Sequence, residues 1–179
     1  MDKLRNYDVV FSGLKNGKHT FQFEIDQAFF DLFEAEQEFS NPRITANVLM
    51  DKHSTFLEFW INISGTVGLQ CDITGDYFDH PIENEIKILV KFGESYDDSN
   101  EEVITIVEND HAFNVAQLIY EDVLLSIPMK KLSPNISAED LEILERFSPK
   151  ESEEPSEEDS QTDNVDPRWE ALKKLKDKN

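Results

Sequence analysis

Five residues between Cys71 and His80 have side chains that could do chemistry. Cys71 is the single cysteine of the chain, and its thiolate could act as a nucleophile or a metal ligand. Three carboxylates and an imidazole follow it at short spacing: Asp72, Asp76, Asp79 and His80. Carboxylate oxygens are the ligands that Mg²⁺ or Mn²⁺ prefers, and such ions activate water in nucleases. This aspartate cluster at residues 72–80 raises the hypothesis of a metal-dependent RNA-processing enzyme.

The same residues also fit a turn that ends a strand. Aspartate, threonine and glycine are common in turns, and the spacing matches no nuclease or calcium motif. A catalytic thiol needs a nearby base, and His80 forms no recognisable motif with the cysteine. We therefore expect the corner motif, formed by Cys71, Asp72, Thr74 and Asp76, to be a scaffold feature of a protein that is not an enzyme. No catalytic residue, metal or cofactor is predicted.

Alternating apolar residues predict strands on both sides of the corner motif. The expected strands cover residues 43–50, 55–63, 66–71, 82–92 and 103–107, with a break at Gly65. The short connections between the strands up to residue 92 favour successive antiparallel strands. We expect an α+β fold, in which a mainly antiparallel, curled sheet covers Phe-rich side chains. Two or three short helices and a flexible C-terminal tail complete it, and closure into a partial barrel is left open.

The remaining local signals concern a hairpin and two helices. Asn16-Gly17 is typical of a tight hairpin, so residues 7–14 and 19–25 are expected to pair. The carboxylate of Asp26 can cap a short helix. A longer helix is expected between Asn114 and Pro128, because proline cannot continue the helical hydrogen bonds.

That longer helix has two chemically different sides. A helical period places Leu118, Ile119, Asp122 and Leu125 on one face. Four other residues lie on or near the polar side: Asn114, Gln117, Tyr120 and Glu121. They could bind a partner, and a simply solvated helix surface is the alternative.

The composition restricts the partners that the chain can bind. The chain carries 17 Lys and Arg residues against 38 Asp and Glu residues, a net charge of -21. A broad nucleic-acid surface needs clustered basic residues, so we expect basic proteins as partners instead. A single cysteine, the lack of an apolar signal sequence at the N-terminus and the lack of a long apolar run predict a cytoplasmic protein without a membrane partner. No small-molecule substrate is predicted.

The composition changes abruptly near the C-terminus. Residues 148–166 contain eight acidic residues and one lysine, which predicts a disordered linker after a globular domain at residues 1–147. Residues 167–179 carry five basic and two acidic residues, and are expected to form a short amphipathic helix. Its apolar stripe of Trp169, Leu172 and Leu175, beside Arg168, could dock on the domain or bind a partner. Both alternatives stay open.

Three segments together resemble the YceD-like family of bacterial large ribosomal RNA subunit accumulation proteins. The first is Gly65-Thr-Val-Gly-Leu-Gln-Cys-Asp72, the second is Phe113 to Pro128 with its Leu-x-x-Pro ending, and the third is Asp166-Pro-Arg-Trp-Glu-Ala-Leu-Lys-Lys-Leu175. Their order along the chain also matches. The corner sequence Cys-Asp-Ile-Thr-Gly resembles the Bacteroidetes branch of the family.

The resemblance implies a role in large-subunit ribosome biogenesis, through a basic ribosomal protein or an assembly factor. Contact with large-subunit rRNA would be local and made by Arg168, Lys173, Lys174 and Lys176; a generic protein-binding adaptor remains an alternative. Many relatives have a second cysteine where this chain has Thr74, and further cysteines after the Leu-x-x-Pro helix. These zinc-type cysteines are absent here, so the resemblance carries no zinc site to this chain.

Overall fold

The computed structural model describes residues 2–33, 35–100, 102–137, 139–140 and 146. The chain divides into two units, residues 1–141 and 142–179, and Arg146 is the one described residue of the second unit. The predicted boundaries at residues 147 and 166 lie outside the described residues and stay predictions. In chain order the elements are a 3₁₀ helix η1 (Asp2–Tyr7), β1 (Asp8–Val10), β2 (Gly17–Ile25), α1 (Gln27–Phe30), β3 (Ser40–Lys52), β4 (Phe56–Gln70), β5 (Tyr77–Gly93), β6 (Asp97–Asn100), β7 (Val103–Val107), β8 (Ala112–Asn114) and α2 (Ala116–Leu125).

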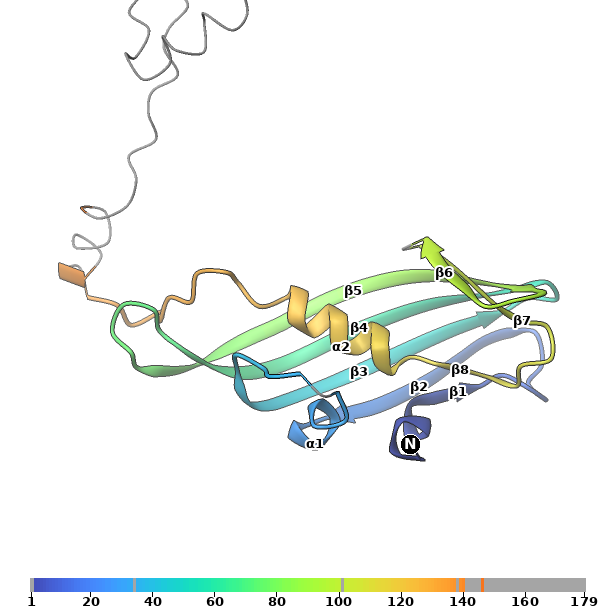
Figure 1. The fold of residues 1–179 in the computed structure, drawn as a ribbon, viewed down its shortest axis with the longest axis horizontal. Helices are drawn as coiled ribbons and strands as arrows, with labels where there is room; N and C mark the ends of the chain where they lie inside the picture. Colours follow the sequence, from blue (N-terminus) through green and yellow to red (C-terminus); the bar gives the residue numbers. More distant parts are fainter. Residues whose placement is uncertain (1, 34, 101, 138, 141–145, 147–179) are drawn as a thin grey trace, which may run out of the picture. The chain divides into compact units, whose positions relative to one another are not determined.

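A six-stranded sheet in the order β2-β3-β4-β5-β7-β6 forms the centre of the first unit (Figure 1). All neighbouring strands are antiparallel except β5 and β7, which are parallel. Strands β1 and β8 form a separate two-stranded ladder. The sheet is open, with β2 and β6 as its outer strands, so the α+β prediction is confirmed and the partial barrel is not formed. Within the described residues, no helix is long and apolar enough to cross a membrane.

One face of the sheet forms the hydrophobic core because its strands alternate apolar and polar residues. In β3 and β4 every second residue is buried, including Val48, Met50, Phe59 and Ile61. Helix α2 packs across β4 and β5 on this face (Figure 1), where its side chains Ile119 and Val123 are fully buried, as are Phe29 and Phe30 of α1. Among the described residues no helix covers the opposite face, which is called the open face below.

The long β4 strand corrects one prediction. Gly65 does not break it, because β4 continues from Phe56 to Gln70. A Cβ atom on Gly65 would lie 2.1 Å from the backbone oxygen of Arg43. Glycine therefore lets β3 approach β4 closely at this position, without ending the strand.

A further prediction about pairing is wrong. Residues 7–14 and 19–25 do not form a hairpin: β1 pairs with β8, and β2 pairs along its whole length with β3. The predicted strand at residues 103–107 is confirmed as β7, and it pairs in parallel with β5. The acidic loop before it contains β6, which was not predicted. In contrast, the Asp26 cap is confirmed, because its Oδ1 accepts a hydrogen bond from the Phe29 N–H (3.2 Å).

Candidate functional site

The corner motif is held together by hydrogen bonds to the segment that follows α2. The Asp72 N–H donates to the backbone oxygen of Lys131 (2.8 Å), and the Lys131 N–H donates back to Asp72 Oδ2 (2.7 Å). The Ser133 N–H points at Cys71 Sγ (3.4 Å), and the Asp76 N–H donates to Thr74 Oγ1 (3.3 Å). These contacts use the polar atoms of the corner motif for local structure.

The thiol of Cys71 is buried, with 3% of the residue exposed. Hydrogen bonds from the backbone N–H groups of Thr74 and Ser133 lower its pKa to about 7. Such donors stabilise a thiolate, but burial limits the access of any reagent. The corner motif therefore contains a buried cysteine whose thiolate form is stabilised by backbone N–H groups.

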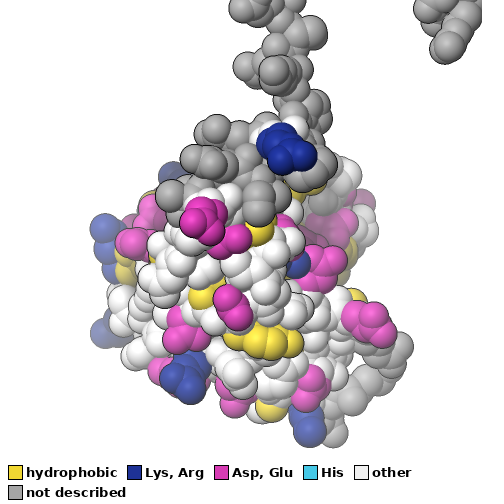
Figure 2. Space-filling view, turned by 90° about the vertical axis from the view of Figure 1, so that its left-hand side faces the viewer, with side chains coloured by type: hydrophobic (Ala, Val, Ile, Leu, Met, Phe, Trp, Pro, Cys, Tyr) yellow, Lys and Arg dark blue, Asp and Glu magenta, His cyan; other side chains and the backbone are white. Residues whose placement is uncertain are grey.

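The aspartates after Cys71 do not converge on one point. Among the described residues, the group of acidic and imidazole side chains close enough to share a cation is Asp51, His53 and Glu58, whose ligand atoms lie within 4.8 Å of one another. Asp72, Asp76, Asp79 and His80 form no such group, and acidic side chains are dispersed over this end of the molecule in Figure 2. The structure thus gives the aspartate-cluster hypothesis no assembled cation site.

The trio of Asp51, His53 and Glu58 is itself part of a surface network of charges. His53 Nε2 lies 3.5 Å from Glu58 Oε2 and 3.9 Å from Asp51 Oδ1. Lys87 Nζ lies 3.3 Å from the other oxygen of Glu58. A lysine already balances this carboxylate, which accounts for the cluster without an ion.

The four residues expected on the polar side of α2 have different surroundings. Asn114 donates hydrogen bonds to Leu4 O (2.8 Å) and Asp8 Oδ1 (2.6 Å), which fixes the N-terminal segment. Tyr120 is buried, and its ring stacks on Phe33 with 4.0 Å between ring centroids. Gln117 and Glu121 are exposed and joined by a hydrogen bond of 2.6 Å. Of the expected recognition face, Gln117 and Glu121 are thus exposed on α2, whereas the exposed amide of Asn114 is already engaged by the N-terminal segment.

Gln117 and Glu121 lie on one wall of a groove of about 570 Å³, which we call the α2 groove. Helix α2 forms this wall, and the segment from Tyr96 to Glu102, which contains β6, contributes the other. Apolar side chains from α2, β5, β7 and β8 also line it: Ile86, Ile88, Ile104, Phe113, Leu118 and Leu125. Four acidic residues share the lining: Asp98, Glu102, Glu121 and Asp122.

Lys87 is the single basic residue of the α2 groove lining, but its charge lies on the other side of the sheet. Its ammonium is 3.3 Å from Glu58 and 5.0 Å from the centre of the Trp60 ring, and both partners belong to the open face. The acidic residues of the groove are therefore not balanced by a basic side chain of the lining.

Asp122 has the most unusual surroundings in the groove. It is 3% exposed, and Asn84 Nδ2 donates a hydrogen bond to its Oδ1 (2.5 Å). Its Oδ2 is closed off from solvent and has no hydrogen-bond partner among the described residues. Burial raises the pKa of this carboxyl, and the Asn84 hydrogen bond opposes part of that effect. A buried carboxyl with one unsatisfied oxygen is costly, so it is a strong candidate for a functional group.

The groove walls influence each other electrostatically. Tyr96 donates a hydrogen bond from its hydroxyl to Asp98 Oδ2 (3.2 Å). Burial, the nearby Asp98 and the more distant Glu121 all raise the pKa of Tyr96. The negative charges of both walls therefore contribute to the electrostatic potential inside the groove.

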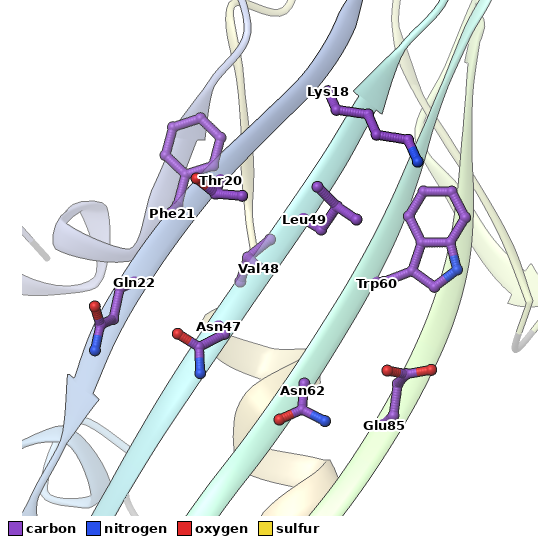
Figure 3. A pocket seen from close by; sticks show the side chains of 10 residues that line it. All are labelled: Lys18, Thr20, Phe21, Gln22, Asn47, Val48, Leu49, Trp60, Asn62 and Glu85. Atoms are coloured by element: carbon purple, nitrogen blue, oxygen red, sulfur yellow. The ribbon is translucent and has the colours of Figure 1, made fainter.

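The open face has a wider hollow of about 730 Å³ with a different character (Figure 3). Gln22, Asn47, Asn62 and Glu85 form a row across β2 to β5. Thr20, Leu49, Trp60 and Lys87 form the next row. Among the side chains that line this hollow, Lys18 and Glu85 carry opposite charges, so the surface is close to neutral.

Sequence reasoning missed most of the α2 groove. Tyr96, Asp98 and Glu102 lie in a segment for which the alternation of side chains predicts no strand. Asp122 was placed on the apolar side of α2, and an aspartate between Leu118 and Leu125 on one helical face was the available signal. The expected partner-binding residues Arg168, Trp169, Leu172 and Leu175, and the possible RNA contacts Lys173, Lys174 and Lys176, lie outside the described residues.

Comparison with known proteins gives one match. A family model described as "Large ribosomal RNA subunit accumulation protein YceD" matches residues 60–176, which is more than half of the chain. The matched range includes β4 from Trp60 onward, the corner motif and α2. No curated protein and no solved structure gives a significant match.

Proposed function

Because the chain belongs to the YceD family of large ribosomal RNA subunit accumulation proteins, we propose that it supports large-subunit biogenesis without catalysis, by binding a basic ribosomal protein or assembly factor. The α2 groove is the surface that makes this contact. The protein acts in the cytoplasm, where ribosomal subunits are assembled. Any contact with large-subunit rRNA is local and involves the basic residues of the C-terminal tail.

The observation that carries this proposal is the unbalanced acidic charge of the α2 groove. Four acidic residues line it, while the ammonium of Lys87 is held by Glu58 and Trp60 on the open face. Complementary charge speeds the encounter of two proteins and selects a basic partner over an acidic one. The apolar side chains in the same groove supply contact area that can be buried, as in the centre of ordinary protein interfaces.

An affinity capture experiment with charge-matched variants tests the proposal. The full-length protein is incubated with a bacterial lysate at low salt, and the captured proteins are identified by mass spectrometry. We expect a basic large-subunit protein or assembly factor, lost when Asp98→Lys and Glu121→Lys are combined. Glu83→Lys with Glu85→Lys changes the net charge equally on β5, outside the groove lining, and should retain the partner. The proposal is wrong if no ribosomal or assembly protein is captured, or if both double variants lose it equally.

Removal of residues 148–179 provides a second arm of this experiment. If the groove makes the main contact, the truncated protein still captures the partner. A complete loss of capture on truncation would assign the main contact to the tail and contradict the role of the groove.

A further inference from the structure

We propose that the α2 groove receives a lysine side chain of the partner, whose ammonium group pairs with Asp122. This inference rests on the proposed function, because it names the chemistry by which the groove recognises a basic partner. It goes beyond that function in assigning a specific residue of the partner to a buried carboxyl.

The first argument is the pattern along α2. Leu118, Asp122 and Leu125 lie at positions i, i+4 and i+7, so they follow one another along a single helical face. All three line the groove. Leu125 is 84% exposed, while the carboxyl-bearing Asp122 is 3% exposed. A charged residue is thus enclosed between two leucines, one of which is open to a partner.

The second argument is the unsatisfied oxygen of Asp122. Oδ1 accepts a hydrogen bond from Asn84, but Oδ2 accepts none among the described residues. A buried carboxylate becomes favourable when a cation pairs with it and completes its hydrogen bonds. Because Oδ2 is closed off from solvent in the free protein, binding requires a local rearrangement that opens it to the entering side chain.

The third argument selects lysine over arginine. An arginine fork is best matched by a carboxylate that offers both oxygens. One oxygen of Asp122 is already used by Asn84, so a single position remains. The compact ammonium of lysine fits such a position, and its four-carbon stem can lie along the apolar side chains of the groove.

The charges around Asp122 favour an incoming cation. On α2 itself, Glu121 directly precedes Asp122 in the sequence. Across the groove, the segment with β6 contributes Asp98, Glu102 and the neutral Tyr96. From β5, Asn84 donates its hydrogen bond, and the ammonium of Lys87 is turned to the open face. The groove lining therefore attracts a cation, and among the described lining residues no basic side chain already pairs with Asp122.

Binding should also release a proton. Burial raises the pKa of Asp122 in the free protein, and an ammonium beside the carboxyl favours its ionised form. The pKa in the complex is therefore lower than in the free protein. Between these two pKa values, binding expels the proton, and affinity increases as the pH rises.

The test compares two conservative variants of full-length protein, Asp122→Asn and Glu121→Gln. Each replaces one carboxyl group by an amide of the same shape, but the first change is buried and the second is exposed. The probes are short amphipathic peptides that differ only in their polar residue: leucine with lysine, with arginine, or with glutamine. Affinity and proton release are measured by titration calorimetry in two buffers with different ionisation enthalpies.

We expect Asp122→Asn to lower the affinity for the lysine peptide about tenfold or more, and Glu121→Gln to lower it no more than about threefold. When the titration is repeated between pH 4 and pH 7, proton release should be seen in part of this range for the unmodified protein and be lost in Asp122→Asn. Thermal unfolding of Asp122→Asn confirms that it is folded. The inference is overturned if both variants weaken binding equally, if no proton is released, or if the arginine or glutamine peptide binds as tightly as the lysine peptide.

The affinity capture experiment separates this inference from the proposed function. If Asp122→Asn captures the basic ribosomal partner as well as the unmodified protein, the lysine contact is wrong while the proposed function stands. If the unmodified protein captures no such partner, the proposed function fails whatever the peptides show.

Discussion

The two faces of the central sheet differ in how their charged side chains are paired. On the open face, Lys87 lies between Glu58 and the ring of Trp60, and Lys18 and Glu85 line the same hollow (Figure 3). In the α2 groove, Asp98, Glu102, Glu121 and Asp122 line a surface without a facing basic side chain. On the open face the ammonium of Lys87 is paired within the protein, whereas the acidic side chains that line the α2 groove have no basic side chain of the lining beside them.

This difference follows from the alternation of side chains along β5. Successive residues of a strand point to opposite faces. Lys87 therefore points to the open face, while its neighbours Ile86 and Ile88 line the α2 groove. A one-residue change of register would bring the lysine into the groove and neutralise part of the negative charge there. The acidic character of the groove thus depends on the pairing of β5 with β4.

The largest expected effect comes from a residue of the hydrophobic core, on the face of the sheet that carries α2. Phe59 is fully buried in β4 and contacts the ring of Phe113 from β8, with 5.1 Å between centroids. Phe59→Ala should lower the free energy of unfolding by about 3–5 kcal/mol, because it leaves a cavity in the core. Urea unfolding measures this loss. A loss of less than about 1 kcal/mol would show that this part of the core is not packed as described.

The next effect should separate the two surfaces. Asp98→Lys with Glu121→Lys should weaken binding of the captured basic partner roughly a hundredfold, because attraction becomes repulsion. Glu83→Lys with Glu85→Lys should change it by less than about threefold, since these residues lie outside the groove. Titration calorimetry with the purified partner measures both. Equal losses would mean that the total charge of the protein, and not the groove, determines binding.

A smaller effect is expected on the pH dependence of the free energy of unfolding. Burial raises the pKa of Asp122 above its ordinary value of 3.8, so the folded protein holds this proton over a pH range in which the unfolded chain has lost it. Stability from this group therefore falls as the pH rises from 3.8 through the folded pKa. Asp122→Asn should remove that fall and be more stable at pH 7.

Urea unfolding of both proteins between pH 4 and pH 7 measures this difference, with Glu121→Gln as the exposed control. If Asp122→Asn shows the same pH dependence as the unmodified protein, the carboxyl is not the source of the fall. Lower stability of the variant at pH 7 would indicate that the ionised carboxylate is already compensated in the folded protein.

The smallest effect is expected on the open face. Lys87→Gln removes the contacts with Glu58 and Trp60, which are weakened by solvent because the Lys87 side chain is 58% exposed. It should lower the free energy of unfolding by no more than about 1 kcal/mol and leave binding of the basic partner unchanged. A clear gain in affinity would show that the charge of Lys87 reaches the α2 groove after all.

The strands were largely predictable because their alternation is a local property of the sequence. Residues 43–50 fall within β3, the predicted strand at 55–63 matches the first part of β4 apart from Thr55, and Asp26 caps α1 as expected. Pairing partners were less predictable. Asn16-Gly17 is a good turn signal, but β2 begins at Gly17 and pairs with β3 over nine residues, which leaves the short β1 to pair with β8.

The candidate site was predictable only in part, for physical reasons. Glu121 and Gln117 could be placed on the polar side of α2 from the helical period. Asp122 could not be assigned a role, because its buried state depends on packing against β5. The wall formed by residues 96–102 depends on the parallel pairing of β7 with β5 and the return of β6, and no local pattern encodes that arrangement.

Hydrogen–deuterium exchange of the complex with the captured basic partner tests the central claim most directly. It locates the contact on the protein without a substitution that could disturb the fold. We predict slower exchange in α2 and in the described residues of the segment 96–102, and unchanged exchange around Trp60 and Asn62 on the open face. Protection confined to the open face or to the corner motif, with α2 unchanged, would contradict the assignment of the α2 groove as the partner-binding surface.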